Sequence, residues 1–438
     1  MSQKTVAIHT LGCKVNQTES AAIAQMFKDS GYTVTEIDQP AHVYIINTCT
    51  VTHLSDRKSR QVIRRAVKAN PDGLVVVTGC YAQTSPGEVI EIPGVDLVVG
   101  TADKNKIVQL VEEAAKKLPQ PLKVVGDIFQ LKKFQEMPTA TDSGKTRAFI
   151  KVQEGCDNHC AYCIIPYARG PLRSRKIESI VQESKELVQR GFKEIVLTGI
   201  HTGAYGLDFK DGTELSTLVK ELVQLPGLAR LRLSSVEPND ITPELIRVMV
   251  QSKVFCNHLH IPLQSGDDQV LKSMRRRYNT GQFAQLIGKI REKIPHIAIT
   301  TDVIVGFPGE TDEMFENTYQ YCRQMAFSGM HVFKYSPRRG TPAADFPNQV
   351  DAKDKERRSY RLIELGCRLA ENYAAKALGK TVEVLAEQRV KDKPDQWEGL
   401  TDTYLRVEFS APGNIKGRLV KVLVTGTNEQ RLFGKINQ

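Results

Sequence analysis

The chain has 438 residues, of which 60 are Lys or Arg and 50 are Asp or Glu, so its formal net charge is +10. This length predicts several domains, and the basic balance is compatible with a nucleic-acid partner without requiring one. The first twenty residues hold no apolar signal run, and no apolar stretch reaches membrane-spanning length. These features argue against a secreted or membrane protein and predict a cytoplasmic one.

Residues 1–125 alternate short apolar runs with helical patterns. Such alternation is typical of a doubly wound parallel α/β domain, in which ligands gather in the crevice beyond the carboxyl ends of the strands. The expected strands are 6–8, 43–46 and 74–77, and the expected helices are 17–30 and 54–69. The first unit is therefore predicted to hold a ligand at one edge of its sheet.

Three cysteines follow these predicted strands. Cys13, Cys49 and Cys80, here called the strand-end triplet, each stand just past a strand, and Gly12 and Gly79 precede two of them. Glycine suits a tight turn or a closely approaching cofactor. Because the ends of parallel strands meet at one edge, we expect the three thiols to converge on one metal site. A chance placement of three cysteines is the weaker alternative.

A polar stretch at 130–145 has the composition of a linker, and the second unit is placed at 142–372. This unit repeats strand and helix, a pattern typical of a full or partial (β/α) barrel, whose active site lies at the carboxyl ends of the strands. The expected strands are 149–152, 194–198, 231–235, 258–261, 297–305 and 331–335, with helices such as 177–190 and 311–325 between them.

The loop after the first of these strands carries a CxxxCxxC motif at Cys156, Cys160 and Cys163, here called the loop triplet. Thiolates so close together suit a soft metal site, and they are the usual ligands of iron–sulfur clusters. Three sulfurs leave one iron of a four-iron cluster with an open position, where chemistry can occur. A zinc site completed by His159 is the alternative.

The remaining cysteines are assigned to packing. In a reducing compartment disulfides are rare, and cysteines serve as metal ligands, catalysts or core residues. Cys256, Cys322 and Cys367 lie in apolar helix or strand patterns, where a thiol behaves as a small hydrophobe.

The third unit, 373–438, changes to short β-prone runs separated by Gly, Pro and Asn. This pattern predicts a small antiparallel β-barrel, a fold that commonly binds nucleic acid through basic and aromatic side chains. For Tyr404, Phe409 and Phe433 a place in the core is nevertheless the better explanation. The expected strands are 381–386, 405–409, 419–425 and 432–436.

One helix of the first unit has a basic face. Arg57, Arg60, Arg64 and Lys68 recur at helical spacing shortly after the second cysteine of the strand-end triplet. This face is a candidate RNA-binding surface, and a plain solvated surface explains it equally well. Further basic clusters lie at 272–277 and 338–339.

Taken together, these features resemble the methylthiotransferases of the radical S-adenosylmethionine (SAM) superfamily from end to end. The resemblance rests on LGCKVN, NTC and TGC in the first unit, and on the CxxxCxxC loop, RSR, SSVEP, PLQSG and GFPGET in the second. It implies an N-terminal methylthiotransferase domain, a radical SAM partial barrel and a C-terminal TRAM domain. The LGCKVN form is similar to the branch acting on N6-threonylcarbamoyladenosine in tRNA. The isopentenyladenosine and ribosomal-protein branches more often carry YGCQMN and LGCPKN.

The resemblance implies two [4Fe–4S] clusters, one on each cysteine triplet. The cluster on the loop triplet would bind SAM at its open iron and cleave it to a radical, and the other would carry the sulfur to be inserted. One SAM would methylate that sulfur, and a second would activate carbon 2 of the adenine next to the anticodon. A C–H bond on an aromatic carbon is too inert for a side-chain base, so a cofactor must supply this chemistry.

The resemblance also implies partners and SAM contacts. The expected partners are tRNA and a one-electron reductase such as a flavodoxin or ferredoxin; the sulfur source stays open, and no membrane is expected. Loops that end barrel strands are candidates for SAM contacts, and one tyrosine beside the cluster is expected to pack on the adenosyl group. The candidates are Tyr162, Gly199, His201, Gln264 and Gly306.

Two alternatives remain open. The same chemistry on isopentenyladenosine in tRNA, or on a ribosomal protein, would change only the substrate. A non-catalytic iron–sulfur RNA-binding protein would show no SAM cleavage under reducing, anaerobic conditions.

Overall fold

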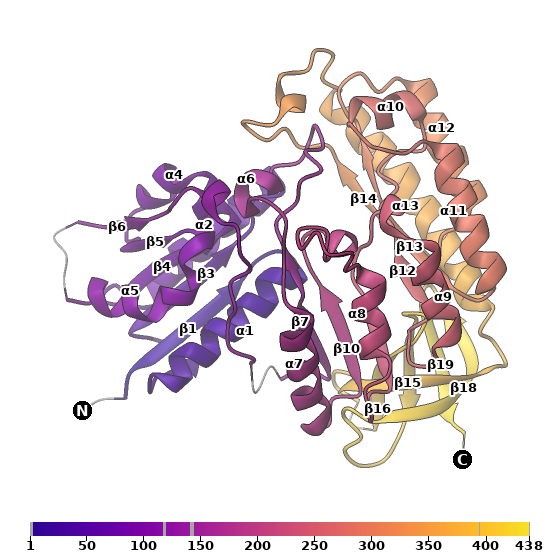
Figure 1. Cartoon of the computed structure of the whole chain (residues 1–438), viewed down its shortest axis with the longest axis horizontal. Coiled ribbons are helices and arrows are strands. Elements are labelled where there is room, and N and C mark those ends of the chain that lie inside the picture. The colour runs from indigo at the N-terminus through magenta and orange to yellow at the C-terminus, as the bar shows by residue number, and fades with distance from the viewer. Residues whose placement is uncertain (1–2, 117–119, 141–143, 394, 438) are drawn as a thin grey trace.

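The computed structural model describes residues 3–116, 120–140, 144–393 and 395–437. Along the chain it forms an α/β domain, a larger domain of parallel strands and helices, and a small barrel (Figure 1). The α/β domain lies beside the larger domain, and the barrel lies at the lower end of the larger domain in that view. The mixed α/β architecture expected from the sequence is confirmed.

The N-terminal sheet has six parallel strands in the order β2-β1-β3-β4-β5-β6. Its central strands are the three apolar runs recognised in the sequence. The outer strands span three residues each, which is too short to show a period, and were not predicted. The strands are β1 (Thr5–Thr10), β2 (Thr33–Thr35), β3 (Val43–Thr48), β4 (Leu74–Gly79), β5 (Leu97–Val99) and β6 (Leu122–Val124).

Helices cover both faces of this sheet. Apolar residues of α1 and α5 pack on one face, and those of α2 and α4 pack on the other, so the domain is doubly wound. All three members of the strand-end triplet lie at the carboxyl edge, beyond β1, β3 and β4. The helices are α1 (Lys14–Asp29), α2 (His53–Ala69), α3 (Cys80–Thr84), α4 (Pro86–Ile90) and α5 (Ile107–Ala114).

The larger domain is a partial barrel of six strands. The described residues from 131 to 146 contain no helix or strand, and the predicted domain start at 142 lies outside the described residues. Two three-stranded parallel sheets, β11-β10-β7 and β12-β13-β14, meet through isolated bridges between β11 and β12. The strands are β7 (Arg147–Lys151), β10 (Glu194–Thr198), β11 (Arg230–Leu233), β12 (His258–His260), β13 (Ala298–Val305) and β14 (Gly329–Lys334).

Helices pack on the outer side of these strands in one continuous core. The antiparallel pair β8 (Gln153–Glu154) and β9 (Arg173–Ser174) frames the cysteine loop. The helices are α6 (Ile165–Arg169), α7 (Ile177–Gln189), α8 (Leu215–Leu222), α9 (Pro243–Gln251), α10 (Asp268–Ser273), α11 (Thr280–Lys293), α12 (Asp312–Met325) and α13 (Ala352–Ala375). Alternate residues of β13 enter this core, and the polar residues between them face the inside of the barrel.

The C-terminal strands close into a barrel in the order β15-β16-β17-β19-β18. Four of its pairings are antiparallel, as expected, but β17 and β19 pair in parallel. β16, whose sequence mixes polar residues with glycine, was not predicted. The strands are β15 (Thr381–Arg389), β16 (Gln396–Thr401), β17 (Arg406–Ser410), β18 (Leu419–Asn428) and β19 (Arg431–Ile436).

Two buried arginines of β11 fasten this barrel to the larger domain. Arg230 Nη1 donates to the carbonyl of Leu400 at 2.9 Å, and Arg232 Nη2 donates to the carbonyl of Thr401 at 3.0 Å. Glu194 of β10 accepts from Arg232 at 2.7 Å, which balances the buried charge. The barrel therefore covers the end of the sheet opposite to the cysteine loop.

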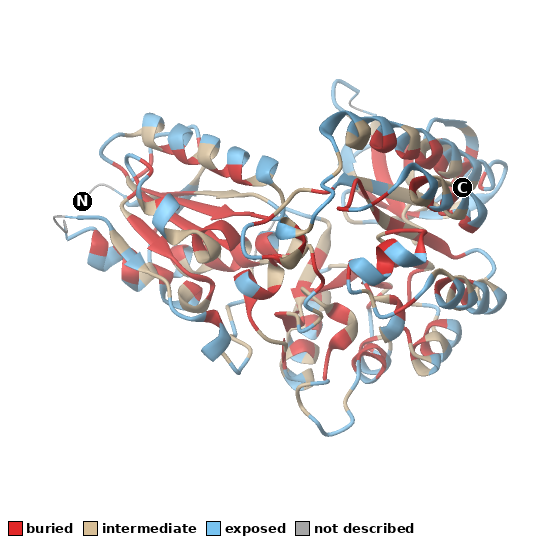
Figure 2. Ribbon diagram, turned by 90° about the horizontal axis from the view of Figure 1, so that it is seen from above, coloured by how far each residue is buried: buried red, intermediate tan, exposed pale blue. Residues whose placement is uncertain are grey.

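Burial follows this architecture. The central strands of the domains are buried, and the outward faces of the helices are exposed (Figure 2). None of the described helices combines the length and apolarity that crossing a membrane requires.

Candidate active site

The strand-end triplet lies together at the carboxyl edge of the N-terminal sheet. Cys49 and Cys80 are buried, whereas Cys13 is exposed. Burial raises the pKa of the Cys49 thiol to about 11, and the nearby thiols of Cys80 and Cys13 add to this rise. Three thiols that influence one another suit a site where a positively charged metal group would favour the thiolate forms.

Two glycines allow the strand ends to approach one another. Gly79 has φ of +97°, and a Cβ there would lie 2.4 Å from the carbonyl oxygen of Thr48. Gly12 has φ of +100°, and its Cβ would lie 2.8 Å from the Cβ of Cys49. A side chain at either position would push the sheet edge apart, so both glycines are required for this convergence.

The loop triplet follows β8 at the carboxyl end of the first barrel strand. Cys160 is buried, and the other two thiols are half-buried. Burial raises the pKa of Cys163, and the neighbouring thiols of Cys160 and Cys156 raise it further. The three cysteines therefore share one site.

The spacing of the thiols favours a multi-iron cluster over zinc. A zinc ion holds sulfurs at about 2.3 Å, so its ligand atoms lie close together. Among the described residues, a three-ligand group with all ligand atoms within 4.8 Å of one another occurs at His260, Asp302 and His331, and it includes no cysteine. His159, the fourth zinc ligand of the alternative, is exposed. Both cysteine triplets therefore fit an iron–sulfur group better than a single ion.

Cationic donors contact a sulfur in each triplet. Arg169 Nε lies 3.3 Å from the sulfur of Cys80, and Arg276 Nη1 lies 3.3 Å from that of Cys160. His201 Nδ1 lies 3.7 Å from the sulfur of Cys156. Hydrogen bonds to cysteine sulfurs stabilise negative charge on a thiolate or cluster and influence its reduction potential.

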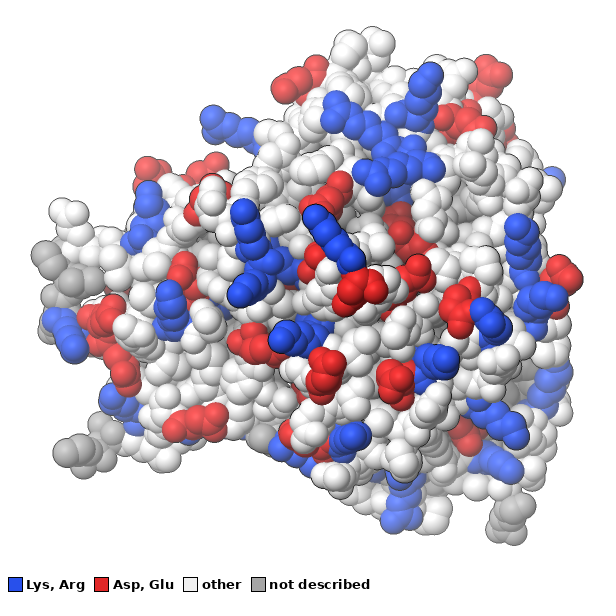
Figure 3. Space-filling view, viewed as in Figure 1, with Lys and Arg blue, Asp and Glu red and all other residues white. Residues whose placement is uncertain are grey.

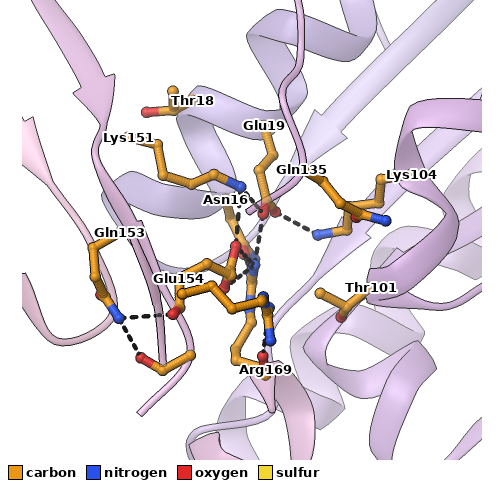
Figure 4. A network of polar contacts seen from close by, with 12 residues as sticks. Asn16, Thr18, Glu19, Thr101, Lys104, Gln135, Lys151, Gln153, Glu154 and Arg169 are labelled. Carbon is orange, nitrogen blue, oxygen red and sulfur yellow. Dashed lines mark hydrogen bonds and ion pairs between the residues drawn. The ribbon is translucent and has the colours of Figure 1, made fainter. Parts of the chain in front are cut away.

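A buried ionic network holds Arg169 in place (Figure 4). Its Nη1 lies 2.6 Å from Glu19 Oε1 on α1 and 3.2 Å from Glu154 Oε1 on β8. Lys151 bridges the same two carboxylates at 3.0 and 2.9 Å, and Lys104 pairs with Glu19. The network therefore joins the N-terminal domain to the barrel domain beside Cys80.

The charges of this network balance one another. Burial would raise the pKa of Glu19, but Arg169, Lys104 and Lys151 hold it well below its usual range. Asn16, within the LGCKVN motif, accepts a hydrogen bond from Arg169 and donates to the carbonyl of Thr48 at 3.0 Å. Apart from Asn16, which belongs to the LGCKVN motif, none of these residues was predicted from the sequence to lie at the site. The signal available was their position: Asn16 lies three residues after Cys13, and Arg169 lies six after Cys163.

His201 lies beside the loop triplet. Its Nε2 contacts Asp240 at 2.7 Å, and its backbone N–H donates to Gln153 at 2.7 Å. Burial lowers the pKa of His201, but hydrogen bonds with Asp240 and Cys156 outweigh that effect and raise it to about 10. Gly199 lies in the same turn, where a Cβ would come within 2.9 Å of Gln153.

The remaining predicted SAM contacts have mixed surroundings. Tyr162 packs on the cluster that contains Phe307 and Tyr335. Gln264 has φ of +67° and pairs with β13 through backbone hydrogen bonds. Gly306 has φ of +71°, and Lys355 covers it, since a Cβ would lie 2.3 Å from the Cγ of that lysine. Whether these residues contact SAM stays a prediction.

The predicted basic face lies on α2. Arg57, Arg64 and Lys68 are exposed, and they remain a candidate RNA-binding surface. Arg60 differs, because its Nη1 donates to the hydroxyl of Tyr81 at 3.0 Å. Its guanidinium is therefore engaged within the domain.

Two family models match the chain. Residues 150–322 match the radical SAM superfamily, and residues 5–100 match uncharacterized protein family UPF0004. Solved structures of low identity show the fold alone. The radical SAM methyltransferase TsrM from Kitasatospora setae superposes with a TM-score of 0.59 at 15% identity, over 78% of this chain and 77% of that one. OxsB, a cobalamin-dependent radical SAM enzyme, has a TM-score of 0.54 at 12% identity, over 85% and 56%.

Curated relatives match over nearly the whole length. Threonylcarbamoyladenosine tRNA methylthiotransferase MtaB of Bacillus subtilis is 48% identical over 96% of this chain and 93% of its own. MtaB of Aquifex aeolicus is 38% identical, over 96% and 100%. The tRNA-2-methylthio-N(6)-dimethylallyladenosine synthase of Moorella thermoacetica is 38% identical, over 99% of both. With two cysteine triplets on a radical SAM fold and relatives of this similarity, the chain belongs to the methylthiotransferase family of radical SAM enzymes.

Proposed function

We propose that this protein adds a methylthio group to carbon 2 of N6-threonylcarbamoyladenosine in tRNA. The observation that carries the proposal is the 48% identity to MtaB of Bacillus subtilis over almost the full length of both chains. Enzymes of this family use SAM and two [4Fe–4S] clusters. The two cysteine triplets, each with a cationic donor 3.3 Å from a sulfur, are the sites proposed for them.

When bound, the cluster on the loop triplet supplies the electron that cleaves SAM, and the cluster on the strand-end triplet supplies the sulfur that is transferred. Cys156, Cys160 and Cys163 would hold the first of these groups. Cys13, Cys49 and Cys80 would hold the second, and Arg169 Nε lies 3.3 Å from the sulfur of Cys80. We propose a flavodoxin or ferredoxin as the reductant and the cytoplasm as the place of action. The tRNA partner follows from the proposed substrate.

The protein contributes placement and charge to this reaction. Arg169 and Arg276 donate hydrogen bonds to cysteine sulfurs, and thereby favour the anionic state of each site. The carboxylates of Glu19 and Glu154 favour the charged form of Arg169, and Lys104 and Lys151 complete the buried network between the two domains. This buried connection positions the two cysteine sites relative to each other, as a reaction that uses both requires.

Nucleoside mass spectrometry tests the proposal. tRNA from a strain lacking the gene is hydrolysed and compared with tRNA from the parent and from the complemented strain. Loss of 2-methylthio-N6-threonylcarbamoyladenosine, with accumulation of its unmethylthiolated precursor, is the expected result. Loss of the isopentenyladenosine derivative instead would assign the alternative tRNA substrate. Unchanged tRNA nucleosides would exclude a tRNA substrate.

A further inference from the structure

A cleft of about 600 Å³ opens between the N-terminal domain and the barrel domain. Gln83 and Thr84 line it from the helix that begins at Cys80, and Ile164, the residue after Cys163, lines it from the other side. Ligand pockets usually enclose about 300–1,000 Å³, so a nucleotide fits this volume. Residues close in sequence to Cys80 and Cys163 therefore line the cleft, which is large enough for a piece of substrate.

Arg338 lines this cleft and has unused donors. Its side chain is 8% exposed and crosses from the barrel domain to the N-terminal domain. Its Nη2 donates to Thr50 Oγ1 at 2.7 Å and to Asp56 Oδ2 at 2.6 Å. Its Nε and Nη1 atoms are buried and contact no acceptor. Buried donors are costly unless they are paired, so this guanidinium is suited to an acceptor that a ligand brings.

The chemistry of these donors favours an oxyanion. A guanidinium binds carboxylate and phosphate oxygens through charge-assisted hydrogen bonds, which are stronger than neutral ones. Arg339, the next residue, is exposed and lines the same cleft. Figure 3 shows several Lys and Arg side chains gathered in the upper middle of the face seen there. Glu88 and Asp127 line the cleft as well, so the directed donors of Arg338, rather than the net charge of the lining, favour an oxyanion there.

Two aromatic rings lie in the same cleft. Phe129 and Tyr167 are 46% and 38% exposed, and both line the cleft. Their rings meet edge to face with centroids 6.2 Å apart. Exposed aromatic side chains beside cationic ones are the usual means by which proteins stack single-stranded RNA bases. The two observations, free guanidinium donors and exposed rings, point to the same class of ligand.

We propose that this cleft binds the anticodon loop of the tRNA substrate, with Arg338 on an oxyanion and with Phe129 and Tyr167 stacking on a base. This inference rests on the proposed function. The oxyanion is a phosphate of the loop or the carboxylate of the threonylcarbamoyl group, which share the same guanidinium chemistry. Residues that follow Cys80 and Cys163 in the chain line this cleft, which connects it with both cysteine sites.

Binding of two RNAs to the reconstituted holoenzyme tests this inference. Both are anticodon stem–loops of one sequence, and they differ in carrying N6-threonylcarbamoyladenosine or unmodified adenosine. Fluorescence anisotropy should show about tenfold weaker binding for Arg338→Gln, as expected for loss of a charge-assisted hydrogen bond. An equal loss of affinity for both RNAs would identify the oxyanion as a phosphate. A loss of affinity confined to the modified RNA would identify it as the carboxylate of the threonylcarbamoyl group. Unchanged affinity for both RNAs overturns the inference.

Asp56→Asn is the matched control. It removes the ion pair between the domains but leaves the guanidinium, so RNA should bind it at least as tightly as it binds the wild type. An equal loss in Asp56→Asn and Arg338→Gln would mean that Arg338 serves domain contact alone, and would overturn the inference.

A second variant protects the test against misfolding. Phe129→Ala combined with Tyr167→Ala removes exposed rings, so its melting temperature should match the wild type while RNA affinity falls about tenfold or more. Wild-type affinity in this variant would also overturn the inference. Methylthiolation by the wild-type enzyme is measured in the same preparations. If it is absent while RNA binding persists, the proposed function fails and the binding result still stands.

Discussion

Arg169 Nη1 lies 2.6 Å from Glu19 Oε1, which joins the helix after β1 to the helix after the CxxxCxxC loop. Both side chains are almost completely buried, and 150 residues separate them in the chain. The same guanidinium donates through Nε to the sulfur of Cys80 at 3.3 Å. One residue therefore connects the contact between the domains with the strand-end triplet.

Glu19→Gln should destabilise the protein strongly. The substitution leaves Lys104, Lys151 and Arg169 with one buried carboxylate instead of two. Breaking a buried ion pair typically costs about 3–5 kcal/mol of unfolding free energy. Urea unfolding measures the change, and Glu112→Gln on the exposed face of α5 is the control, with an expected change below about 0.5 kcal/mol. Equal stability of both variants would contradict this role of Glu19.

The same carboxylate makes stability depend on acid pH. Its folded-state pKa lies well below the usual range, so its contribution is fully present above the unfolded-state pKa of about 4.3. That contribution is lost as pH falls through the lower folded-state value, because protonation removes the charge that the three cations need. The wild type should therefore lose stability more steeply than Glu19→Gln below about pH 4.3, as urea midpoints measured across that range would show.

Iron content should report each cysteine site separately. Two four-iron clusters require about eight irons per chain in anaerobically reconstituted protein. Replacing all three cysteines of either triplet by Ala should halve the iron. SAM cleavage should disappear when the loop triplet is replaced and persist when the strand-end triplet is replaced. Full iron content in either triple variant would show that the replaced cysteines are not ligands.

The exposed basic residues of α2 should contact phosphates. Reversing the charge of Arg57 and Arg64 should weaken tRNA binding and flatten its salt dependence, because each lost phosphate contact lowers the slope by about 0.7–0.9. Filter binding at several salt concentrations measures both. Lys289→Glu combined with Lys293→Glu, both on the exposed side of α11, is the control for net charge. If affinity and slope stay as in the wild type, the α2 face is a plain solvated surface.

Two phenylalanines of the C-terminal barrel should behave differently. Phe409 is 1% exposed in the barrel core, so Phe409→Ala should cost about 3–5 kcal/mol of unfolding free energy. Phe433 is 36% exposed, so Phe433→Ala should leave the melting temperature unchanged. If the barrel binds RNA by stacking, only Phe433→Ala should weaken tRNA binding in folded protein. Unchanged tRNA affinity in Phe433→Ala would show that any RNA binding by the barrel depends on other residues.

Much of the fold could be predicted because it depends on local patterns. The buried runs of β3 and β4 are continuous and apolar, which is typical of parallel strands covered on both faces. The three-residue strands β2, β5 and β6 carry no such period, and the parallel pairing of β17 with β19 joins segments that the chain does not bring together locally. Very short strands, and pairings between segments that are distant in the chain, could therefore not be predicted from the sequence.

The cysteine sites were predicted from the sequence by itself, because Cys156, Cys160 and Cys163 lie within eight residues and the other three cysteines each follow an apolar strand. Only the tertiary structure decided which side chains surround them. Glu19 meets Arg169, and Asp56 meets Arg338, across 150 and 282 residues of chain. Local sequence determines helices and strands through backbone periodicity, whereas such contacts depend on how folded domains pack, and no periodicity records that packing.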